Sequence, residues 1–392
     1  MSVFLDHAAT TPLRPEAMVA LEKALGVLGN PSSVHSDGQR TRAILEDARD
    51  QISKAADCNR SEVVFTSGGT ESNNEAIKGL YWEANNKDPL KNLIITSAAE
   101  HHAALDPALW LAAEQGAEIH YVDLEANGMV KLGELEEFIM LNSSRIALIS
   151  LIWVNNETGV ITDVPRIAKL AKELGIAIHS DAVAAFGNIP LSFKDSNLTS
   201  MAISGHKVGS PIGVGALIVS RGAKPASLLH GGGQERGLRS GTMNYPLAAA
   251  FAAAAAAAQL DMALRAQRLV GLRDHLEREI LKAIPNALRT AFGAERVPHN
   301  AHLIFDGVQS DSLLFLLDQR GISVSAGSAC QAGVLAPSHV LLAMGYSETQ
   351  AGACLRITLG RTTTQSDVDV FIDAIVPSFE QSLLAGLSSR AI

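Results

Sequence analysis

Residues 176–207, IAIHSDAVAAFGNIPLSFKDSNLTSMAISGHK, hold the strongest evidence for the fold. An apolar run at 176–179 leads to Asp181, and a second run at 201–204 is followed closely by Lys207. Short apolar runs separated by a connection long enough for a crossover predict parallel strands of one sheet. Ligands of such sheets bind at the carboxyl ends of the strands, so Asp181 and Lys207 are the first candidate site residues.

The same alternation extends toward the N-terminus. Helical segments are expected to begin near Thr70 and to span 102–115, and they separate further apolar runs. Those runs lie at 63–66, 93–96, 119–122 and 146–152. Strands that are apolar on both faces and alternate with helices indicate a mainly parallel sheet covered on both sides. The predicted fold class is therefore α/β.

The pattern changes after Pro246. Residues 247 to about 284 are rich in alanine, a strong helix former, and predict a long helix that is broken or kinked. Shorter strands are expected beyond it, at 302–305, 322–325 and 355–359. We take the long helix as the hinge between two domains. They are a large domain at 15–258 and a small domain made of 1–14 and 259–392.

The composition is that of a globular protein, with 47% hydrophobic residues and a formal net charge of -9. Acidic and basic residues are interspersed, which argues against a nucleic-acid partner. No apolar run reaches the length needed to cross a bilayer, and no targeting segment is expected before the first strand. The three cysteines include no C-x-x-C pair. A reducing cytoplasm is therefore expected, and a disulfide scaffold or zinc site is not.

Lys207 and Asp181 become informative as a pair. A lysine after a strand, or an aspartate in a turn, is commonplace when it stands alone. Pyridoxal phosphate (PLP) needs both residue types, because a lysine forms the Schiff base and a carboxylate keeps the pyridine nitrogen protonated. The pair therefore favours a PLP site.

Three further segments at strand ends fit this chemistry. The small residues of Thr66–Asn73, which include Gly69 and Thr70, let backbone N–H groups approach a phosphate at a helix N-terminus. His101 follows the next predicted strand, where a histidine can stack on the ring and shuttle protons. Asn156 follows a later strand, where it either bonds the cofactor or substrate or forms a simple turn.

Two residues in the C-terminal part complete the candidate set. Cys330 lies in a loop of small residues, SAGSACQAG at 325–333, where an exposed thiol suits a mobile nucleophile. Cys58 and Cys354 lack such surroundings and are expected to be structural. Arg356 stands in the apolar run LRITL and needs a partner there, either a substrate carboxylate or an internal ion pair.

Taken together, these segments resemble the cysteine desulfurases of the nitrogen-fixation and iron–sulfur-cluster type, within the class V aminotransferase group. The resemblance covers nearly the whole chain. Further matches are LDHAATTP at 5–12, GNPSS at 29–33, HGGGQER at 230–236, RSGT at 239–242 and PSHVL at 337–341. The resemblance implies a fold-type I PLP-dependent transferase, with a mainly parallel seven-stranded sheet in the large domain and a smaller α+β domain.

The resemblance also implies roles for the candidate residues. Lys207 is the Schiff-base lysine, Asp181 is the partner of the pyridine nitrogen, and His101 stacks on the ring. Asn156 and Arg356 grip the substrate carboxylate, and Asn156 also lies near the ring. The phosphate region is held by Gly69, Thr70, Ser204, His206 and, from the neighbouring subunit, Thr242.

The implied reaction converts L-cysteine to L-alanine and leaves the sulfur on Cys330 as a persulfide. The implied partners are a second copy of the chain, in a homodimer, and a sulfur-acceptor protein such as an iron–sulfur scaffold. No nucleic acid, membrane or resident metal is expected, although Cys330 is a candidate transient ligand of an iron–sulfur cluster. A selenocysteine lyase or a transaminase of the same fold is the alternative, and the Cys330 loop favours desulfuration.

One position departs from the family pattern. A glutamine usually stands three residues after the aspartate and bonds the phenolic oxygen of the cofactor, whereas this chain has Ala184. The hydrogen bond is therefore lost or supplied by another donor. We expect a retuned cofactor rather than an inactive enzyme, because the lysine, the aspartate and the cysteine are all present.

Overall fold

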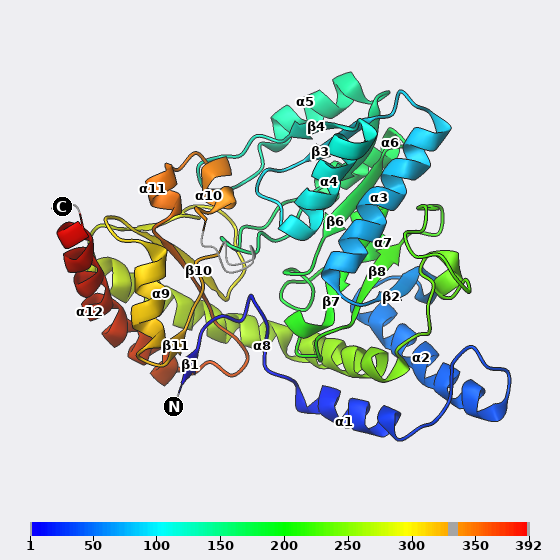
Figure 1. The fold of residues 1–392 in the computed structure, drawn as a ribbon, viewed down its shortest axis with the longest axis horizontal. Helices are drawn as coiled ribbons and strands as arrows, with labels where there is room; N and C mark the ends of the chain where they lie inside the picture. The colour runs from blue at the N-terminus through cyan, green and yellow to red at the C-terminus, as the bar shows by residue number, and fades with distance from the viewer. Residues whose placement is uncertain (1, 328–335, 390–392) are drawn as a thin grey trace.

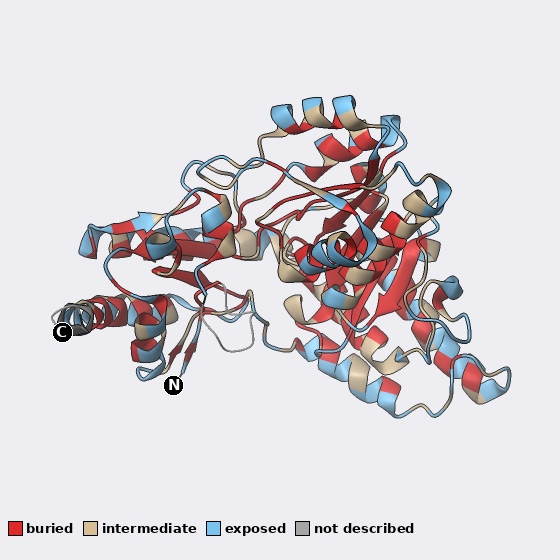
Figure 2. Ribbon diagram, turned by 45° about the horizontal axis from the view of Figure 1, so that its top comes forward, coloured by how far each residue is buried: buried red, intermediate tan, exposed pale blue. Residues whose placement is uncertain are grey.

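The computed structural model describes residues 2–327 and 336–389, with side chains as far as Leu384. Figure 1 shows two bodies joined by one long helix, a larger body around the main sheet and a smaller one near both ends of the chain. The strands inside both bodies are largely buried, and the exposed residues lie mostly on the outer faces of helices and on loops (Figure 2). The predicted α/β class is confirmed.

The large sheet has seven strands in the order β2-β8-β7-β6-β5-β3-β4. These are β2 (Val63–Thr66), β3 (Leu93–Thr96), β4 (Glu118–Tyr121), β5 (Ile146–Ser150), β6 (Ala177–Asp181), β7 (Ser200–Ser204) and β8 (Gly215–Val219). Each strand predicted for this sheet is present, with its ends shifted by at most two residues. The sequence pattern did not indicate β8, which runs antiparallel between β2 and β7 and makes the sheet mainly, rather than wholly, parallel.

Helices cover both faces of this sheet. They are α1 (Pro15–Leu25), α2 (Ser36–Ala55), α3 (Gly69–Lys87), α4 (His102–Gln115), α5 (Leu132–Asn142), α6 (Val164–Glu173) and α7 (Phe193–Ser196). Successive residues of a strand point to opposite faces. Ile149 accordingly belongs to the core that contains Ile52 of α2, and Leu148 to the core that contains Leu80 of α3. The sheet is therefore buried on both sides, as its continuous apolar runs predicted.

The long helix α8 (Tyr245–Ala283) is a single element of 39 residues. The predicted break or kink is wrong, because the alanine-rich run continues without interruption into the charged second half. Ala252 and Phe251 pack in the large core, whereas Leu269 and Leu276 pack in the small one. By length and composition alone α8 could also cross a membrane, whereas the sequence pattern had indicated no apolar run long enough to do so.

The small body combines two short sheets with helices. Its elements are β1 (Val3–Phe4), β9 (Ala287–Arg289), β10 (Asn300–Phe305), α9 (Ser310–Asp318), β11 (Ile322–Ser323), α10 (His339–Ala343), α11 (Glu348–Ala351), β12 (Cys354–Thr358) and α12 (Gln365–Ser389). Strands β12, β10 and β9 are antiparallel, and the N-terminal β1 pairs in parallel with β11. The predicted domain boundary at 258/259 falls inside α8, and it stays a prediction.

Candidate active site

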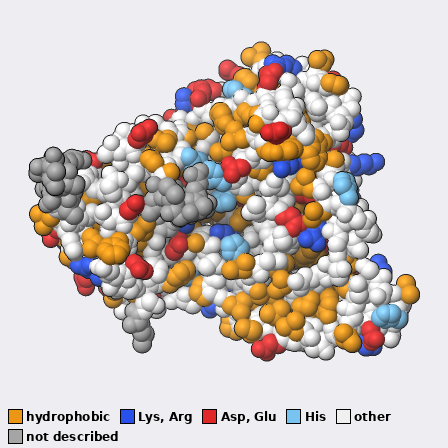
Figure 3. All heavy atoms as spheres, in the orientation of Figure 1, with side chains coloured by type: hydrophobic (Ala, Val, Ile, Leu, Met, Phe, Trp, Pro, Cys, Tyr) orange, Lys and Arg blue, Asp and Glu red, His pale blue; other side chains and the backbone are white. Residues whose placement is uncertain are grey.

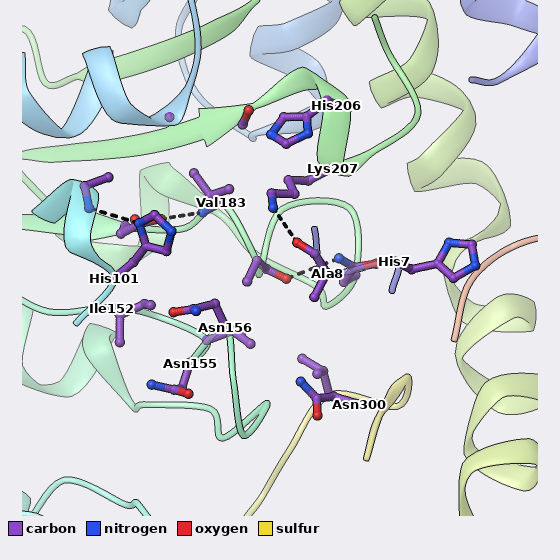
Figure 4. Close-up of a pocket in the computed structure, with 18 of the residues that line it drawn as sticks. His7, Ala8, His101, Ile152, Asn155, Asn156, Val183, His206, Lys207 and Asn300 are labelled. Carbon is purple, nitrogen blue, oxygen red and sulfur yellow. Dashed lines mark hydrogen bonds between the residues drawn. The ribbon is translucent and has the colours of Figure 1, made fainter. Parts of the chain in front are cut away.

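A cavity of about 250 Å³ lies at the carboxyl ends of the large-sheet strands, where the small body approaches them. Figure 4 shows its labelled residues converging from the large sheet, from the N-terminal segment at His7 and Ala8, and from the small body at Asn300. Many of the predicted site residues line it. These are Gly69, Thr70, His101, Asn156, Asp181, Ser204, His206 and Lys207.

Lys207 ends the short 3₁₀ turn (Gly205–Lys207) that follows β7. Its Nζ donates a hydrogen bond to the carbonyl oxygen of Ala8 (Figure 4) and another, of 2.9 Å, to that of Ala9. The backbone N–H of Thr11 donates to the carbonyl of His206 at 3.2 Å, which fixes the same N-terminal segment against the turn. The amine is therefore held in the cavity by a segment from the opposite end of the chain.

Asp181 ends β6, next to β7 in the sheet, and only 4% of its surface is exposed. Its Oδ2 accepts a hydrogen bond of 2.6 Å from Nδ2 of Asn73, and its Oδ1 accepts one of 2.9 Å from the backbone N–H of Val183. The expectation from parallel strands is therefore met, since Asp181 and Lys207 line one cavity from neighbouring strand ends.

The N-terminus of α3 forms a close-fitting cradle beside this pair. A Cβ atom added at Gly69 would lie 2.7 Å from Cγ2 of Val183, so the backbone approaches at a distance that a larger residue prevents. Backbone N–H groups at the start of a helix attract an anion such as a phosphate. Burial, with a smaller effect from Lys207, lowers the pKa of the neighbouring His206 to about 4, so this ring is neutral at pH 7.

His101 caps the N-terminus of α4, where its Nδ1 accepts a hydrogen bond of 3.0 Å from the backbone N–H of Ala103. Burial lowers the pKa of His101, against the opposing attraction of Asp181, and the imidazole is therefore neutral. Because Nδ1 acts as the acceptor, the proton of the neutral ring resides on Nε2. His101 can thus donate a hydrogen bond from Nε2, and it can accept a proton at Nδ1 only when the bond to Ala103 is released.

Arg356 lies buried in β12, and of the two partners considered from the sequence, a substrate carboxylate or an internal ion pair, the structure shows an ion pair with Asp6. Its Nη2 donates to Oδ1 of Asp6 at 3.0 Å, and its Nη1 donates to the backbone carbonyl of Asn156 at 2.9 Å. Arg356 is not among the residues that line the cavity, so it supports Asn156 from behind. Oδ1 of Asn156 and Nε of Arg356 are buried without a hydrogen-bond partner in the described part of the chain.

The remaining assigned residues lie elsewhere. Cys330 lies outside the described residues. Thr242 is exposed and does not line the cavity of its own chain, and the resemblance places it in the site of a neighbouring subunit. Burial raises the pKa of Cys58 and of Cys354 to about 12, so neither thiol is a ready nucleophile, as expected for structural cysteines.

Sequence reasoning missed several lining residues, and for two different reasons. Asn73 stands three residues after Thr70 on α3, and this spacing puts both on one face of the helix, a signal that was available. His7, His299 and Asn300 come from segments remote in the sequence, which only the packing of the small body brings to the cavity. His7 lies in the matched segment LDHAATTP but was given no role, and no local pattern marks His299 or Asn300.

The residues of the cavity fit PLP. Gly69 leaves room for a phosphate at a helix N-terminus, Asp181 offers a carboxylate, and the buried Oδ1 of Asn156 awaits a partner. Across residues 2–327 and 336–389, no group of three or more His, Cys, Asp or Glu side chains is placed to hold a metal ion.

A lysine and an aspartate at neighbouring strand ends, beside a helix that begins at Gly69, are the arrangement expected of a PLP enzyme. Residues 3–371 match the family model described as aminotransferase class-V. The chain belongs to this family, whose enzymes depend on PLP. An IscS-like cysteine desulfurase of Mycobacterium tuberculosis is 41% identical over 387 residues, which cover 98% of each chain.

Solved structures agree with this placement. A NifS-like protein from Rickettsia africae superposes with a TM-score of 0.86 at 32% identity, covering 97% of this chain and 100% of that chain. A structure described as SspA in complex with cysteine gives a TM-score of 0.76 at 30% identity, covering 91% and 99% of the two chains. The resemblance to PLP-dependent cysteine desulfurases and the fold-type I architecture are therefore confirmed.

Proposed function

We propose that this chain removes the sulfur of L-cysteine, releases L-alanine and keeps the sulfur on Cys330 as a persulfide. The observation that carries the proposal is the convergence of Lys207 and Asp181 on one cavity. L-Cysteine as the substrate is supported by the relative described as a cysteine desulfurase and by the similar structure in complex with cysteine. The change balances, because the C–S bond of the substrate breaks and an S–S bond forms. The hydrogen lost by the Cys330 thiol is matched by the one gained at Cβ, which becomes a methyl group.

Bound PLP supplies an electron sink for the negative charge left at Cα of the substrate. The protein groups do the rest. Lys207, held at the carbonyls of Ala8 and Ala9, is the amine placed to take and return the Cα proton. His101 offers a hydrogen-bond donor, its Nε2–H, at the same cavity. Asn156 holds the substrate carboxylate, with Arg356 fixing its backbone and adding positive charge.

The test is an assay of the purified protein with L-cysteine and a reductant, in which alanine and sulfide are both measured. Cys330→Ala is expected to keep the yellow cofactor and to release no sulfur, and Lys207→Ala is expected to lose the borohydride-reducible linkage. Cys58→Ala is the matched control, because that thiol is made unreactive by burial. Full sulfur release by Cys330→Ala would overturn the proposed acceptor.

Selenocysteine lyase activity is the second candidate, because selenocysteine differs from cysteine only in the replacement of sulfur by selenium. Desulfuration is favoured by the name of the Mycobacterium tuberculosis relative, an IscS-like cysteine desulfurase that covers 98% of the chain. Rates of sulfide release from cysteine and selenide release from selenocysteine separate the two. A comparable rate with cysteine supports the proposal, and activity confined to selenocysteine contradicts it.

We also propose that two copies form a homodimer. Large apolar side chains are exposed on α1 and the turn after it, and Leu28 is 86% exposed. Figure 3 shows hydrophobic side chains gathered on this part of the large body. Leu28→Glu is expected to weaken the dimer in analytical ultracentrifugation, whereas Leu141→Glu, at a residue 85% exposed on α5, is the control. A monomeric unmodified protein contradicts the proposal.

The persulfide is proposed to serve a sulfur acceptor such as an iron–sulfur scaffold in the cytoplasm, with Cys330 able to ligate a cluster transiently. The IscS-like name of the relative supports this use. Incubation with radiolabelled cysteine and a candidate scaffold tests it, since the label is expected to move to the scaffold only when Cys330 is present. Cell fractionation tests the location.

A further inference from the structure

A row of buried side-chain hydrogen bonds lies behind the carboxylate of Asp181. Oγ of Ser200 lies 2.8 Å from Nδ1 of His179, and Nε2 of His179 lies 2.9 Å from Oδ1 of Asn73. Nδ2 of Asn73 then lies 2.6 Å from Oδ2 of Asp181. Ser200, His179 and Asn73 have no exposed surface, so water does not compete for these bonds.

The carboxylate fixes the direction of every bond in the row. A carboxylate oxygen accepts, so Asn73 must turn its Nδ2 toward Asp181 and its Oδ1 toward His179. The oxygen of Asn73 requires a donor, and Nε2 of His179 must carry the proton. Burial lowers the pKa of His179 to about 3, so the ring is neutral and its Nδ1 accepts from the Ser200 hydroxyl.

The backbone explains why these residues meet. His179 and Asp181 stand two apart on β6 and therefore face the same side of the sheet. His179 pairs in register with Ser200 of β7. Asn73 comes from α3, one helical turn after Thr70, and its single hydrogen bond to Asp181 ties that helix to the strand. The row thus links α3, whose N-terminus is assigned to the phosphate, to Asp181, which is assigned to the ring nitrogen.

We propose that Asn73 and His179 are positioning residues for the cofactor, which orient the carboxylate of Asp181 and fix its spacing from the N-terminus of α3. The inference deepens the proposed function and rests on the assigned role of Asp181. Neither residue touches the reacting atoms of the substrate in this assignment. They act through Asp181.

The chemistry of the row suits this role because it orients the carboxylate without neutralising it. The two hydrogen-bond donors to Asp181 are the side-chain amide of Asn73 and the backbone N–H of Val183, and both are uncharged. The neighbouring carboxyl of Glu100 is fully buried, and burial, with a smaller effect from Asp181, raises its pKa well above the usual range. Glu100 is therefore protonated and adds no second negative charge. The carboxylate of Asp181 remains available to a protonated ring nitrogen.

The first test compares Asn73→Ala with Ser72→Ala in the full-length protein. Ser72 is equally buried on α3 and makes a bond of 2.8 Å to Thr66, away from Asp181. Asn73→Ala is expected to raise the dissociation constant of PLP about tenfold, as for loss of a buried bond to a charged group. It is also expected to shift the pH titration of the cofactor's visible band. Ser72→Ala is expected to lower the melting temperature and to leave both cofactor readouts unchanged.

The second test uses His179 and needs no cofactor. Nitrogen-15 NMR of the cofactor-free protein is expected to show the Nε2-protonated tautomer of His179, with no titration between pH 5 and 8. His179→Phe is expected to shift the visible titration in the direction of Asn73→Ala, and the double variant no further, because the residues act in series. His179→Gln, which keeps a donor near Nε2, is expected to restore part of the effect.

The outcomes separate the inference from the proposed function. An Nδ1-protonated His179, or additive effects of Asn73→Ala and His179→Phe on the titration, would overturn the row as a positioning device, even if the enzyme desulfurates cysteine. Equal shifts by Ser72→Ala and Asn73→Ala would overturn it as well, since the effect would then follow stability alone. Inactivity toward cysteine with the predicted tautomer and spectra would contradict the function and leave the row supported.

Discussion

The two walls of the cavity differ in how completely their buried polar atoms are paired. On the Asp181 wall, the carboxylate and the side chain of Asn73 behind it find partners within the protein. On the opposite wall, Oδ1 of Asn156 and Oδ1 of Asn300 have no partner in the described chain, and neither has Nε of Arg356 behind that wall. A buried unpaired polar atom costs about 1–3 kcal/mol. The polar groups of the first wall are therefore paired within the protein, whereas the second wall leaves polar atoms that a bound ligand can pair.

The largest effect is expected on the paired wall. Asp181→Ala removes the carboxylate assigned to the ring nitrogen, and kcat for alanine formation is expected to fall about 10³-fold, the scale seen when a preorganised electrostatic partner is lost. Single-turnover assays at saturating PLP measure this. A rate within a few fold of the unmodified protein would show that the paired wall is not where the cofactor is tuned.

Behind the unpaired wall, Arg356→Ala is expected to raise KM for L-cysteine about 100-fold, because the positive charge behind Asn156 is lost. It also leaves Asp6 without its partner, at a cost of about 3 kcal/mol in the free energy of unfolding. Steady-state kinetics and urea unfolding measure the two effects. An unchanged KM with the full loss of stability would assign Arg356 to the internal ion pair alone.

A smaller effect is expected from pH, through the buried His302 beside Arg356. Burial lowers the pKa of His302 from 6.5 to about 3, so between these values the unfolded chain binds a proton that the folded one does not. Stability therefore falls as the pH falls through this window. From pH 7.5 to 5.5 the loss from this group is about 1.4 kcal/mol. Urea unfolding of His302→Gln is expected to show a loss smaller by that amount, and an equal loss would place the titration elsewhere.

The smallest effect is expected at Ala184, which lines the cavity where the family has glutamine. Ala184→Gln is expected to shift the pH titration of the cofactor's visible band by less than about one unit, the scale of one added hydrogen bond. The amide of Asn188, which donates to the carbonyl of Ala184 at 3.2 Å, also lines the cavity, so Asn188→Ala tests whether it is the substitute donor. No shift with Ala184→Gln would show that the missing glutamine does not tune the cofactor.

The sequence predicted the strand-end residues of the cavity far better than lining residues such as His7 and Asn300, for a physical reason. Lys207 and Asp181 follow buried parallel strands, whose carboxyl ends meet at one edge whatever the rest of the chain does. The positions of His7 and Asn300 depend instead on how the small body docks, which no local period encodes. The sequence pattern also did not indicate the antiparallel strand β8 or the unbroken course of α8.

Because α8 is one unbroken helix, the number of residues between its two halves sets the rotation of one body relative to the other. Its two halves belong to different cores, and the cavity is assembled from the bodies built on each. Inserting one residue between Ala258 and Leu269 would turn one body about 100° relative to the other and move it about 1.5 Å along the axis. A chimera that takes its C-terminal body from a relative must therefore keep the number of residues in α8, even where the exposed side chains of this helix are exchanged.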